Sequence, residues 1–339
     1  FRSSRSTDGK QHGLLERGTE IVLYRTNKSL GTVRGLLDGA TMRDPVAREA
    51  LFFDRTSRAV VIHGPGRASL EDAQIPEIKP GDVLIRTSYS GICGVDLEVF
   101  DGTLGMRRNG TAAYPIVPGH ELSGRVVTIG PNVSGVKEGD AVVVESDQSC
   151  GTCAECRRSN WILCADRVEL GVNGRNGGHA QHTVIPGRFL HLLPPNLDLT
   201  KATLCQPLAM ILKGLTRLSR AWAPGPEVKR CGVVGAGSRG HLCARVLDLW
   251  GHTVTAFDRN PLRRSYFNGS NIEASDDLGR LGEFDVLVEA TGDPDVLEAM
   301  LDKSPPGATI LLLGLPYARK QFTLDTIAAY DKTIVGSVG

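Results

Sequence analysis

The sequence predicts an α/β protein in two parts, a β-rich domain followed by a doubly wound parallel sheet. From Ala59 onward, short β-rich runs are bounded by Gly or Pro, which is typical of a barrel or sandwich. From about Pro207 onward, strand-like and helix-like segments alternate, and this order favours a parallel sheet covered by helices. A chain of 339 residues is long enough for such a pair of domains.

The first part is expected to span residues 58–206. Its predicted strands are 59–63, 82–88, 124–129, 140–145 and 182–186. Residues 1–57 have weak periodicity, with short apolar pieces at 21–24 and 51–53 among charged residues. We interpret them as an N-terminal extension of unknown role.

The second part is expected to span residues 207–339. Its predicted strands are 230–234, 253–257, 285–289, 309–314 and 333–336, and its predicted helices are 208–219, 241–249 and 294–301. A sheet of this kind normally has a covering helix after its last strand. We therefore expect that a further C-terminal piece follows residue 339 in a longer product.

The composition is that of an ordinary globular chain and argues against several classes of function. Hydrophobic residues make up 41% and charged residues 23% of the chain, and the net charge is +1. This balance offers no basic field for nucleic acid, and no apolar run approaches the roughly 18 residues of a membrane span. No apolar signal core follows the initial letters FRSSRS. We expect a cytoplasmic protein without nucleic-acid or membrane partners.

Four of the eight cysteines lie in one short row, spaced C-x2-C-x2-C-x7-C. They are Cys150, Cys153, Cys156 and Cys164. Four thiolates on one loop can close a tetrahedral shell around a structural zinc ion. The alternatives are a disulfide-rich loop or free structural thiols. Zinc is favoured because nothing else in the chain looks secreted, and closely spaced cysteines in an intracellular protein indicate a metal.

A glycine motif follows the first strand of the second part. Gly235, Gly237 and Gly240 form G-x-G-x-x-G between a predicted strand and a predicted helix. The first glycine permits a sharp turn, the second lets a pyrophosphate approach the backbone, and the third lets helix and strand pack closely. The free N–H groups of the helix N-terminus attract phosphate. The motif therefore predicts a dinucleotide cofactor.

An acidic residue after the next strand indicates which dinucleotide is bound. Asp258 can accept hydrogen bonds from the adenosine ribose and repel a 2′-phosphate, so NAD is favoured over NADP. Arg259, Arg263 and Arg264 follow closely, and their guanidinium groups could hold that phosphate, so NADP stays possible. The alternative role for Asp258 is that of a helix cap.

Residues outside the cysteine row have the chemistry of a second metal site. Cys93, His120 and Glu121 are ordinary zinc ligands, and Gln206 follows in the segment LCQPLA. Three protein ligands with an open position describe a catalytic zinc site. Spacing alone cannot show that they converge. Taken singly, Cys93 is more often a small buried hydrophobe and His120 a satisfied loop histidine.

Together these pieces resemble the zinc-dependent medium-chain dehydrogenase/reductase superfamily, most of all its sorbitol, threonine and glucose dehydrogenase branch. The family's order and separations are matched over residues 58–339 by GICGVD, GHELSGRVVTIGPNV, the cysteine row, GGHAQHTVIP, QPLA and GAGSRG. The resemblance implies a GroES-like catalytic domain followed by a Rossmann domain, with the active site in the cleft between them. It implies that Cys93, His120 and Glu121 hold a catalytic zinc, with Gln206 where relatives carry Glu or Cys.

Two positions depart from the family pattern. Relatives usually carry Ser or Thr two residues after the metal cysteine, where the hydroxyl relays a proton, but this chain has Val95, which can neither donate nor accept one. Gln206 is neutral, so it can offer an amide oxygen, directly or through water, without cancelling the charge of zinc. The neighbouring Asp96 is a candidate for orienting nearby groups or for holding the loop.

The implied function is hydride transfer between an alcohol, polyol or sugar hydroxyl and NAD(P). Zinc lowers the pKa of the substrate hydroxyl, and hydride passes from the carbinol carbon to the nicotinamide. The proton leaves through water or another side chain. The backbone of Gly314 and Leu315 is expected to line the nicotinamide pocket. By analogy with relatives we expect a homo-oligomer, with one zinc ion in each of the two clusters of every chain.

Two other functions stay open. A catalytically silent, zinc-structured nucleotide-binding module is compatible with Val95, because a fold does not fix a function. A zinc-free reductase of enones or quinones could use the same fold, although such relatives generally lack both metal motifs. Metal content and NADH production with polyols or sugars separate these possibilities.

Overall fold

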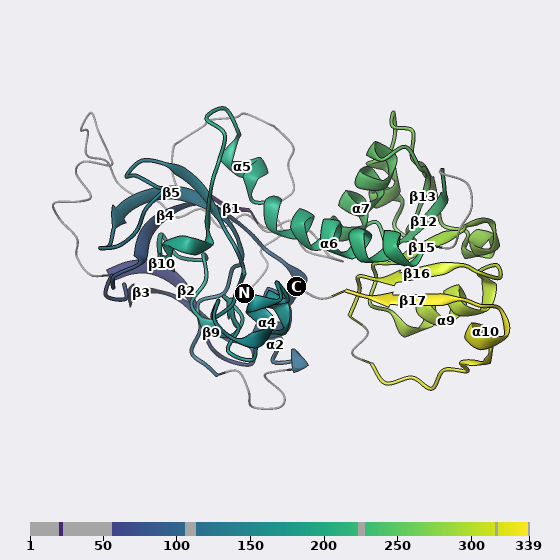
Figure 1. Ribbon diagram of the computed structural model, residues 1–339, viewed down its shortest axis with the longest axis horizontal. Coiled ribbons are helices and arrows are strands. Elements are labelled where there is room, and N and C mark those ends of the chain that lie inside the picture. The colour runs from purple at the N-terminus through teal and green to yellow at the C-terminus, as the bar shows by residue number, and fades with distance from the viewer. Residues whose placement is uncertain (1–19, 23–55, 106–112, 223–227, 316–317, 338–339) are drawn as a thin grey trace, which may run out of the picture.

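The computed structural model describes residues 20–22, 56–105, 113–222, 228–315 and 318–337. These residues form a β-rich part and a part built on a parallel sheet. Figure 1 shows helix α6 (Cys205–Ala221) running from the first part to the second. The α/β class and the order of the two parts are therefore as the sequence predicts.

The β-rich part is built on a six-stranded sheet. Five of its strands follow the order β1-β4-β5-β6-β11, and the sixth, β10, pairs with β4 in antiparallel fashion outside this order. Its strands are β1 (Glu20–Val22), β4 (Asp82–Gly91), β5 (Glu121–Ile129), β6 (Ala141–Val144), β10 (His182–Pro186) and β11 (Leu190–Leu192). Apolar side chains of β4, β5 and β6, such as Val83, Val126 and Val142, are fully buried in one cluster. β1 pairs with β4 in parallel, so one described piece of the expected N-terminal extension joins this sheet.

Smaller elements surround this sheet. Two strands form an antiparallel hairpin, β2 (Thr56–Gly64) and β3 (Arg67–Gln74), and three form a small sheet, β7 (Asp147–Gln148), β8 (Val168–Leu170) and β9 (Gly174–Arg175). The helices here are α2 (Gly94–Asp101), α4 (Ala154–Arg157) and α5 (Leu199–Ala202), with 3-10 turns η1 (Trp161–Leu163) and η2 (Gly187–Phe189). Neither β3 nor α2 was expected. β3 carries mostly polar, part-exposed side chains. α2 begins inside the segment GICGVD, which from its sequence we interpret only as a metal motif.

The second part is a six-stranded parallel sheet in the order β14-β13-β12-β15-β16-β17. Its strands are β12 (Arg230–Val234), β13 (Thr253–Phe257), β14 (Glu273–Ser275), β15 (Val286–Glu289), β16 (Thr309–Leu312) and β17 (Thr333–Gly336). Counted along the chain this is the order 3-2-1-4-5-6 of a dinucleotide-binding fold. The predicted doubly wound sheet is confirmed. β14 was not expected, because its three residues give no pattern.

Helices cover both faces of the parallel sheet. They are α6, α7 (Ser238–Leu249), α8 (Pro261–Ser265), η3 (Leu278–Glu283), α9 (Pro294–Lys303) and α10 (Asp325–Ala329). Leu215 of α6 and Leu247 of α7 are fully buried in the cluster on one face. Met300 of α9 and Leu281 of η3 are fully buried in the cluster on the other face. No helix among the described residues is long and apolar enough to cross a membrane.

Element bounds differ from expectation at positions that matter for the site. α6 begins at Cys205, so the boundary predicted between residues 206 and 207 lies inside its first turn. β2 begins at Thr56, before the boundary predicted at residue 58. β16 ends at Leu312, so Gly314 lies beyond the strand rather than at its end. The division into domains stays a prediction, and the apolar piece at 51–53 lies outside the described residues.

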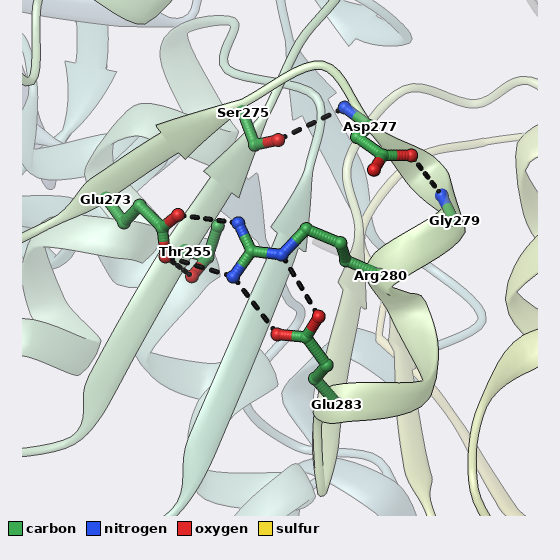
Figure 2. A network of polar contacts seen from close by, with 7 residues as sticks. All are labelled: Thr255, Glu273, Ser275, Asp277, Gly279, Arg280 and Glu283. Atoms are coloured by element: carbon green, nitrogen blue, oxygen red, sulfur yellow. Dashed lines mark hydrogen bonds and ion pairs between the residues drawn. The ribbon is translucent and has the colours of Figure 1, made fainter.

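A polar network fixes the β14 edge of the parallel sheet, as Figure 2 shows. The guanidinium of Arg280, in η3, donates to both carboxylate oxygens of Glu273, on β14, at 2.5 and 3.2 Å. It also donates to Glu283 at 3.1 and 3.0 Å. Thr255 of β13 donates to Glu273 at 3.1 Å. The side chain of Glu273 therefore links the short edge strand β14 both to β13 and to η3. Such a forked arginine restricts geometry more than a single ion pair does.

Gly240→Ala should lower the free energy of unfolding by about 1–3 kcal/mol, the usual cost of forcing extra atoms into packed space. A Cβ at this position would lie 1.7 Å from the carbonyl oxygen of Gly235. Gly237→Ala is the matched control, because a Cβ there meets no heavy atom within 4 Å among the described residues. Its change should stay within about 0.5 kcal/mol. Equal denaturant midpoints for the two variants would contradict close packing at Gly240.

Candidate active site

Three side chains with metal-binding chemistry converge where β4 and β5 meet. Cys93, His120 and Glu121 each offer one ligand atom, and these atoms all lie within 4.8 Å of one another. The register of the antiparallel pair places Gly91, at the end of β4, opposite Glu121, at the start of β5. Cys93 follows β4 as the N-cap of α2, and His120 immediately precedes β5. The strand pairing therefore brings together residues that are far apart in the sequence.

The donor set fits a zinc ion. Burial lowers the pKa of His120, but the nearby carboxylate of Asp96 and the thiol of Cys93 outweigh it and raise that pKa to about 10. Burial also raises the pKa of Glu121. The Nδ1 atom of His120 is buried without a hydrogen-bond partner in the described residues. A half-buried cluster of thiol, imidazole and carboxylate matches three zinc ligands with an open position.

Asp96 ties the two ligand-bearing segments together. Its Oδ2 accepts the backbone N–H of Cys93 at 2.8 Å, and its Oδ1 accepts the backbone N–H of Gly119 at 3.0 Å. Oδ1 also lies 3.6 Å from Nδ1 of His120. Burial raises the pKa of Asp96, but His120 and His179 outweigh it and hold the pKa at about 2. Asp96 therefore holds the loop at Cys93 and Gly119 and also faces the ring of His120, so the structure is compatible with both roles considered for it.

Gln206 lies in the first turn of α6 and points its amide toward a different partner. Its Nε2 donates to Oγ of Ser146 at 3.1 Å. Ser146 is buried just before β7, and its hydroxyl donates to Asp147 at 3.2 Å. The hydrogen bond that the structure gives Gln206 is thus not to the three-residue cluster. Its role as a zinc ligand stays a prediction.

The cysteine row forms a second compact group in the loop between β7 and β8. The four sulfur atoms lie within 4.8 Å of one another, and all four residues are free thiols rather than disulfides. Backbone N–H groups of Cys153 and Thr152 point at the sulfur of Cys150 at 3.3 and 3.4 Å. Thr152 is the main cause that lowers the pKa of Cys150 to about 6. Four converging sulfurs on one loop fit a closed tetrahedral zinc shell.

The glycine motif forms the expected turn between β12 and α7. Gly235 has a φ of +98°, which only glycine adopts readily, and its N–H bonds the carbonyl of Phe257 at 2.8 Å. Asp258 follows β13, is 9% exposed, and accepts the N–H of Ala236 within the motif at 2.9 Å. Asp258 is therefore attached directly to the turn. The cap of α8 is Asn260, so the helix-cap alternative for Asp258 does not hold.

Three arginines near Asp258 occupy different environments. Arg263 lies 3.3 Å from the Asp258 carboxylate and balances part of its charge. Arg259 is exposed to solvent. Arg264 donates to the backbone carbonyl of Asp258 at 2.7 Å and pairs with Asp276 at 2.9 Å. Asp258 and the exposed Arg259 thus follow one another in the sequence at the end of β13.

Gly314 and Leu315 lie in the segment after β16. The N–H of Gly314 bonds the carbonyl of Glu289 at 2.9 Å. A Cβ at Gly314 would lie 2.3 Å from the backbone nitrogen of Gly292, so only glycine fits here. Leu315 is 42% exposed. Both residues therefore lie at the carboxyl end of the sheet, where dinucleotides bind in such folds.

Arg239 is not among the predicted site residues, because it occupies a position of the glycine motif at which any residue is allowed. It lies in the first turn of α7, and its Nη1 donates to the carbonyl of Leu313 at 3.0 Å. Its positive charge is close enough to lower the pKa of Glu121, against the larger effect of burial. Arg239 therefore ties the first turn of α7 to the segment after β16. No single-sequence signal pointed to this connection.

Comparisons with known proteins agree with this geometry. Residues 79–195 match the family model for the alcohol dehydrogenase GroES-like domain. D-altritol 5-dehydrogenase of Agrobacterium fabrum is 34% identical over 280 residues, which cover 80% of this chain and 81% of that protein. Sorbitol dehydrogenase of Bacillus subtilis is 28% identical over 272 residues, which cover 76% and 75%.

A solved structure has the same fold over most of its length. It is a protein from Sinorhizobium meliloti 1021 described as a zinc-binding dehydrogenase, bound to NADP, with a TM-score of 0.74 and 25% identity. The match covers 83% of this chain and 84% of that one. The expected GroES-like and Rossmann architecture is confirmed. The chain belongs to the zinc-dependent medium-chain dehydrogenase/reductase superfamily, in its sorbitol dehydrogenase-like branch.

Proposed function

We propose that the protein is a zinc-dependent dehydrogenase that transfers a hydride between a polyol or sugar hydroxyl and NAD(P). The observation that carries this proposal is the convergence of Cys93, His120 and Glu121 in a chain that also has a glycine turn for a dinucleotide. The relatives act on sugar alcohols by their names, which supports the same substrate class here. The two metal groups disfavour a zinc-free reductase of enones or quinones.

In this mechanism the chain's own residues hold the zinc and orient its ligands. Cys93, His120 and Glu121 would hold the zinc, while Asp96 fixes the backbone of Cys93 and faces His120. When bound, zinc supplies Lewis-acid polarisation of the substrate hydroxyl, and the dinucleotide supplies the hydride acceptor. Val95 packs against a hydrophobic cluster and has no group that can take up the hydroxyl proton. The proton therefore leaves through water or another side chain.

The dinucleotide site favours NAD. The N-terminus of α7 and the turn at Gly237, where a side chain would meet open space, can receive a pyrophosphate. The Asp258 carboxylate would accept the ribose hydroxyls and repel a 2′-phosphate. Arg263 and Arg259 weaken that repulsion, and one solved relative binds NADP. We infer that discrimination against NADP is real but modest.

Cys93→Ala should lower the zinc content from two ions to one per chain, given the two candidate groups. Turnover of a polyol panel should fall at least about a thousandfold, because a Lewis acid contributes several kcal/mol to the transition state. Metal analysis and NADH absorbance measure both effects. Cys205→Ala is the control, a half-buried cysteine beside Gln206 that belongs to neither group. A Cys93→Ala enzyme with wild-type rates would reject the catalytic zinc, and unchanged zinc content would reject the cluster as a metal site.

Cys153→Ser should remove the zinc of the cysteine row and lower the melting temperature by at least about 5 °C, because that metal contributes folding energy directly. Turnover measured well below the melting temperature should fall much less than in Cys93→Ala, since a closed shell has no open position. Scanning calorimetry and limited proteolysis of the loop check this. Cys205→Ser makes the same substitution outside the row. Normal stability of Cys153→Ser after chelator treatment would contradict a structural zinc.

Asp258→Asn should lower the preference for NAD over NADP, expressed as a ratio of kcat/KM values, by about tenfold or more. Asparagine keeps an oxygen for the Ala236 N–H but removes the negative charge. Asp276→Asn is the control, because that exposed carboxylate pairs with Arg264 instead. An unchanged ratio, or a wild-type enzyme that prefers NADP, would show that Asp258 does not select the cofactor.

A further inference from the structure

A second imidazole, His179, lies against the carboxylate that orients the metal cluster. Nε2 of His179 is 3.7 Å from Oδ2 of Asp96, while Nδ1 of His120 is 3.6 Å from Oδ1. Each oxygen of Asp96 therefore faces one imidazole nitrogen and accepts one backbone N–H. Both histidines are at least nine-tenths buried, at 4% and 5% exposed. Nε2 of His179 has no hydrogen-bond partner among the described residues, because 3.7 Å exceeds the usual range of about 2.7–3.2 Å.

Ser90 defines how the ring of His179 is held. The Oγ atom of Ser90 lies 2.9 Å from Nδ1 of His179. A carboxylate only accepts hydrogen bonds, so Nε2, which faces Asp96, carries the proton in the neutral ring. Nδ1 then accepts the hydroxyl proton of Ser90. A hydroxyl can donate or accept, so Ser90 holds Nδ1 in the tautomer that Asp96 requires.

The order Ser90, His179, Asp96 resembles that of a hydrolytic triad, but its location rules out that role. Ser90 is 2% exposed on β4, where no substrate can reach its hydroxyl. The series of side chains from Ser90 through His179 ends at Asp96. The other contacts of Asp96 are all in segments that carry metal-binding residues. A nucleophile needs access to a substrate, whereas a positioning group needs rigidity and burial.

The backbone around His179 is packed directly on the segment that carries His120. The N–H groups of Gly177, Gly178 and His179 bond the carbonyls of residues 117, 119 and 118 at 2.7, 2.7 and 2.9 Å. A Cβ at Gly177 would lie 2.2 Å from the carbonyl oxygen of Gly119. A Cβ at Gly119 would lie 2.5 Å from Nδ1 of His179. The glycines thus allow an approach that places His179 at a fixed distance from the His120 segment.

We propose that His179, set by Ser90, is a positioning residue for the metal centre, an inference that rests on the proposed function. An ionised carboxylate offers about four acceptor positions. Asp96 faces four donors, namely the backbone N–H groups of Cys93 and Gly119 and the ring nitrogens of His120 and His179. Removing His179 leaves Asp96 held only by the two backbone N–H groups, so its carboxylate can shift relative to His120, which loosens the zinc. Groups of this kind around metal ligands typically change metal affinity by about 10–100-fold.

His179→Phe tests this in the full chain loaded with zinc or cobalt(II). We expect zinc to leave the Cys93 cluster about 10–100-fold more readily, measured by competition with a chromogenic chelator. The zinc of the cysteine row should be retained as in the wild type. The visible bands of cobalt(II) at the Cys93 cluster should shift, which a change in stability alone would not produce. His179→Gln, which keeps an N–H donor, should restore part of the affinity.

His191→Phe is the matched control. His191 also contacts a carboxylate, that of Glu145 at 2.7 Å, but both side chains are exposed and distant in sequence from the cluster. Its zinc release should equal that of the wild type. Wild-type zinc release and an unchanged cobalt spectrum in His179→Phe would overturn the inference and leave the proposed function intact.

A second variant keeps the test decisive if His179→Phe does not fold. Ser90→Ala removes only the hydroxyl that holds Nδ1 of His179, and it should speed zinc release in the same direction, by about threefold to tenfold. Wild-type release in Ser90→Ala together with His179→Gln would overturn the inference. If Cys93→Ala binds as much zinc as the wild type, no metal centre exists at the cluster, and the proposed function falls together with the inference.

Discussion

The antiparallel pairing of β4 with β5 is the constraint on which the candidate site depends. In this register the last residue of β4, Gly91, lies opposite the first residue of β5, Glu121. The residues just beyond these ends, Cys93 and His120, are therefore neighbours. A Cβ at Gly91 would lie 2.5 Å from Oε2 of Glu121, so a larger residue here would displace that carboxylate. A shift of one residue in this register would turn the side chains to opposite faces and separate the cluster.

The charged groups around His120 make the cluster suited to a cation. Asp96, Cys93 and Glu121 surround His120 in a buried space, and together they raise the pKa of that imidazole despite its burial. Arg239 adds a positive charge from the dinucleotide side of the molecule. Buried charged groups are costly unless they are paired or coordinate a metal. A divalent cation at the cluster would balance the two anionic ligands, and the glycine turn would then place a dinucleotide on the Arg239 side.

Local patterns made the architecture predictable, but not the convergence within the site. The alternation of strands and helices and the motif at Gly235 identified the parallel sheet, because these signals lie within a few residues of one another. The proximity of Cys93 to His120 depends on strand pairing, and only the family resemblance supplied it beforehand. Ser90 and His179 are 89 residues apart in sequence, so no spacing rule could connect them. β3 was missed because its polar side chains lack an apolar alternation.

Val95 stands where relatives carry a proton-relaying hydroxyl, so the cluster must be weighed against a protein without catalytic activity. Its side chain packs with Val99 and Ile62, so this position anchors α2 instead of carrying a hydroxyl. A scaffold without chemistry would gain by replacing the buried ion cluster with apolar residues of similar volume, since such replacements are often neutral or stabilising. The chain instead keeps three converging ligands and supports them with Asp96, held by two backbone N–H groups. This combination favours a working metal centre in which the proton leaves by a route that does not pass through Val95.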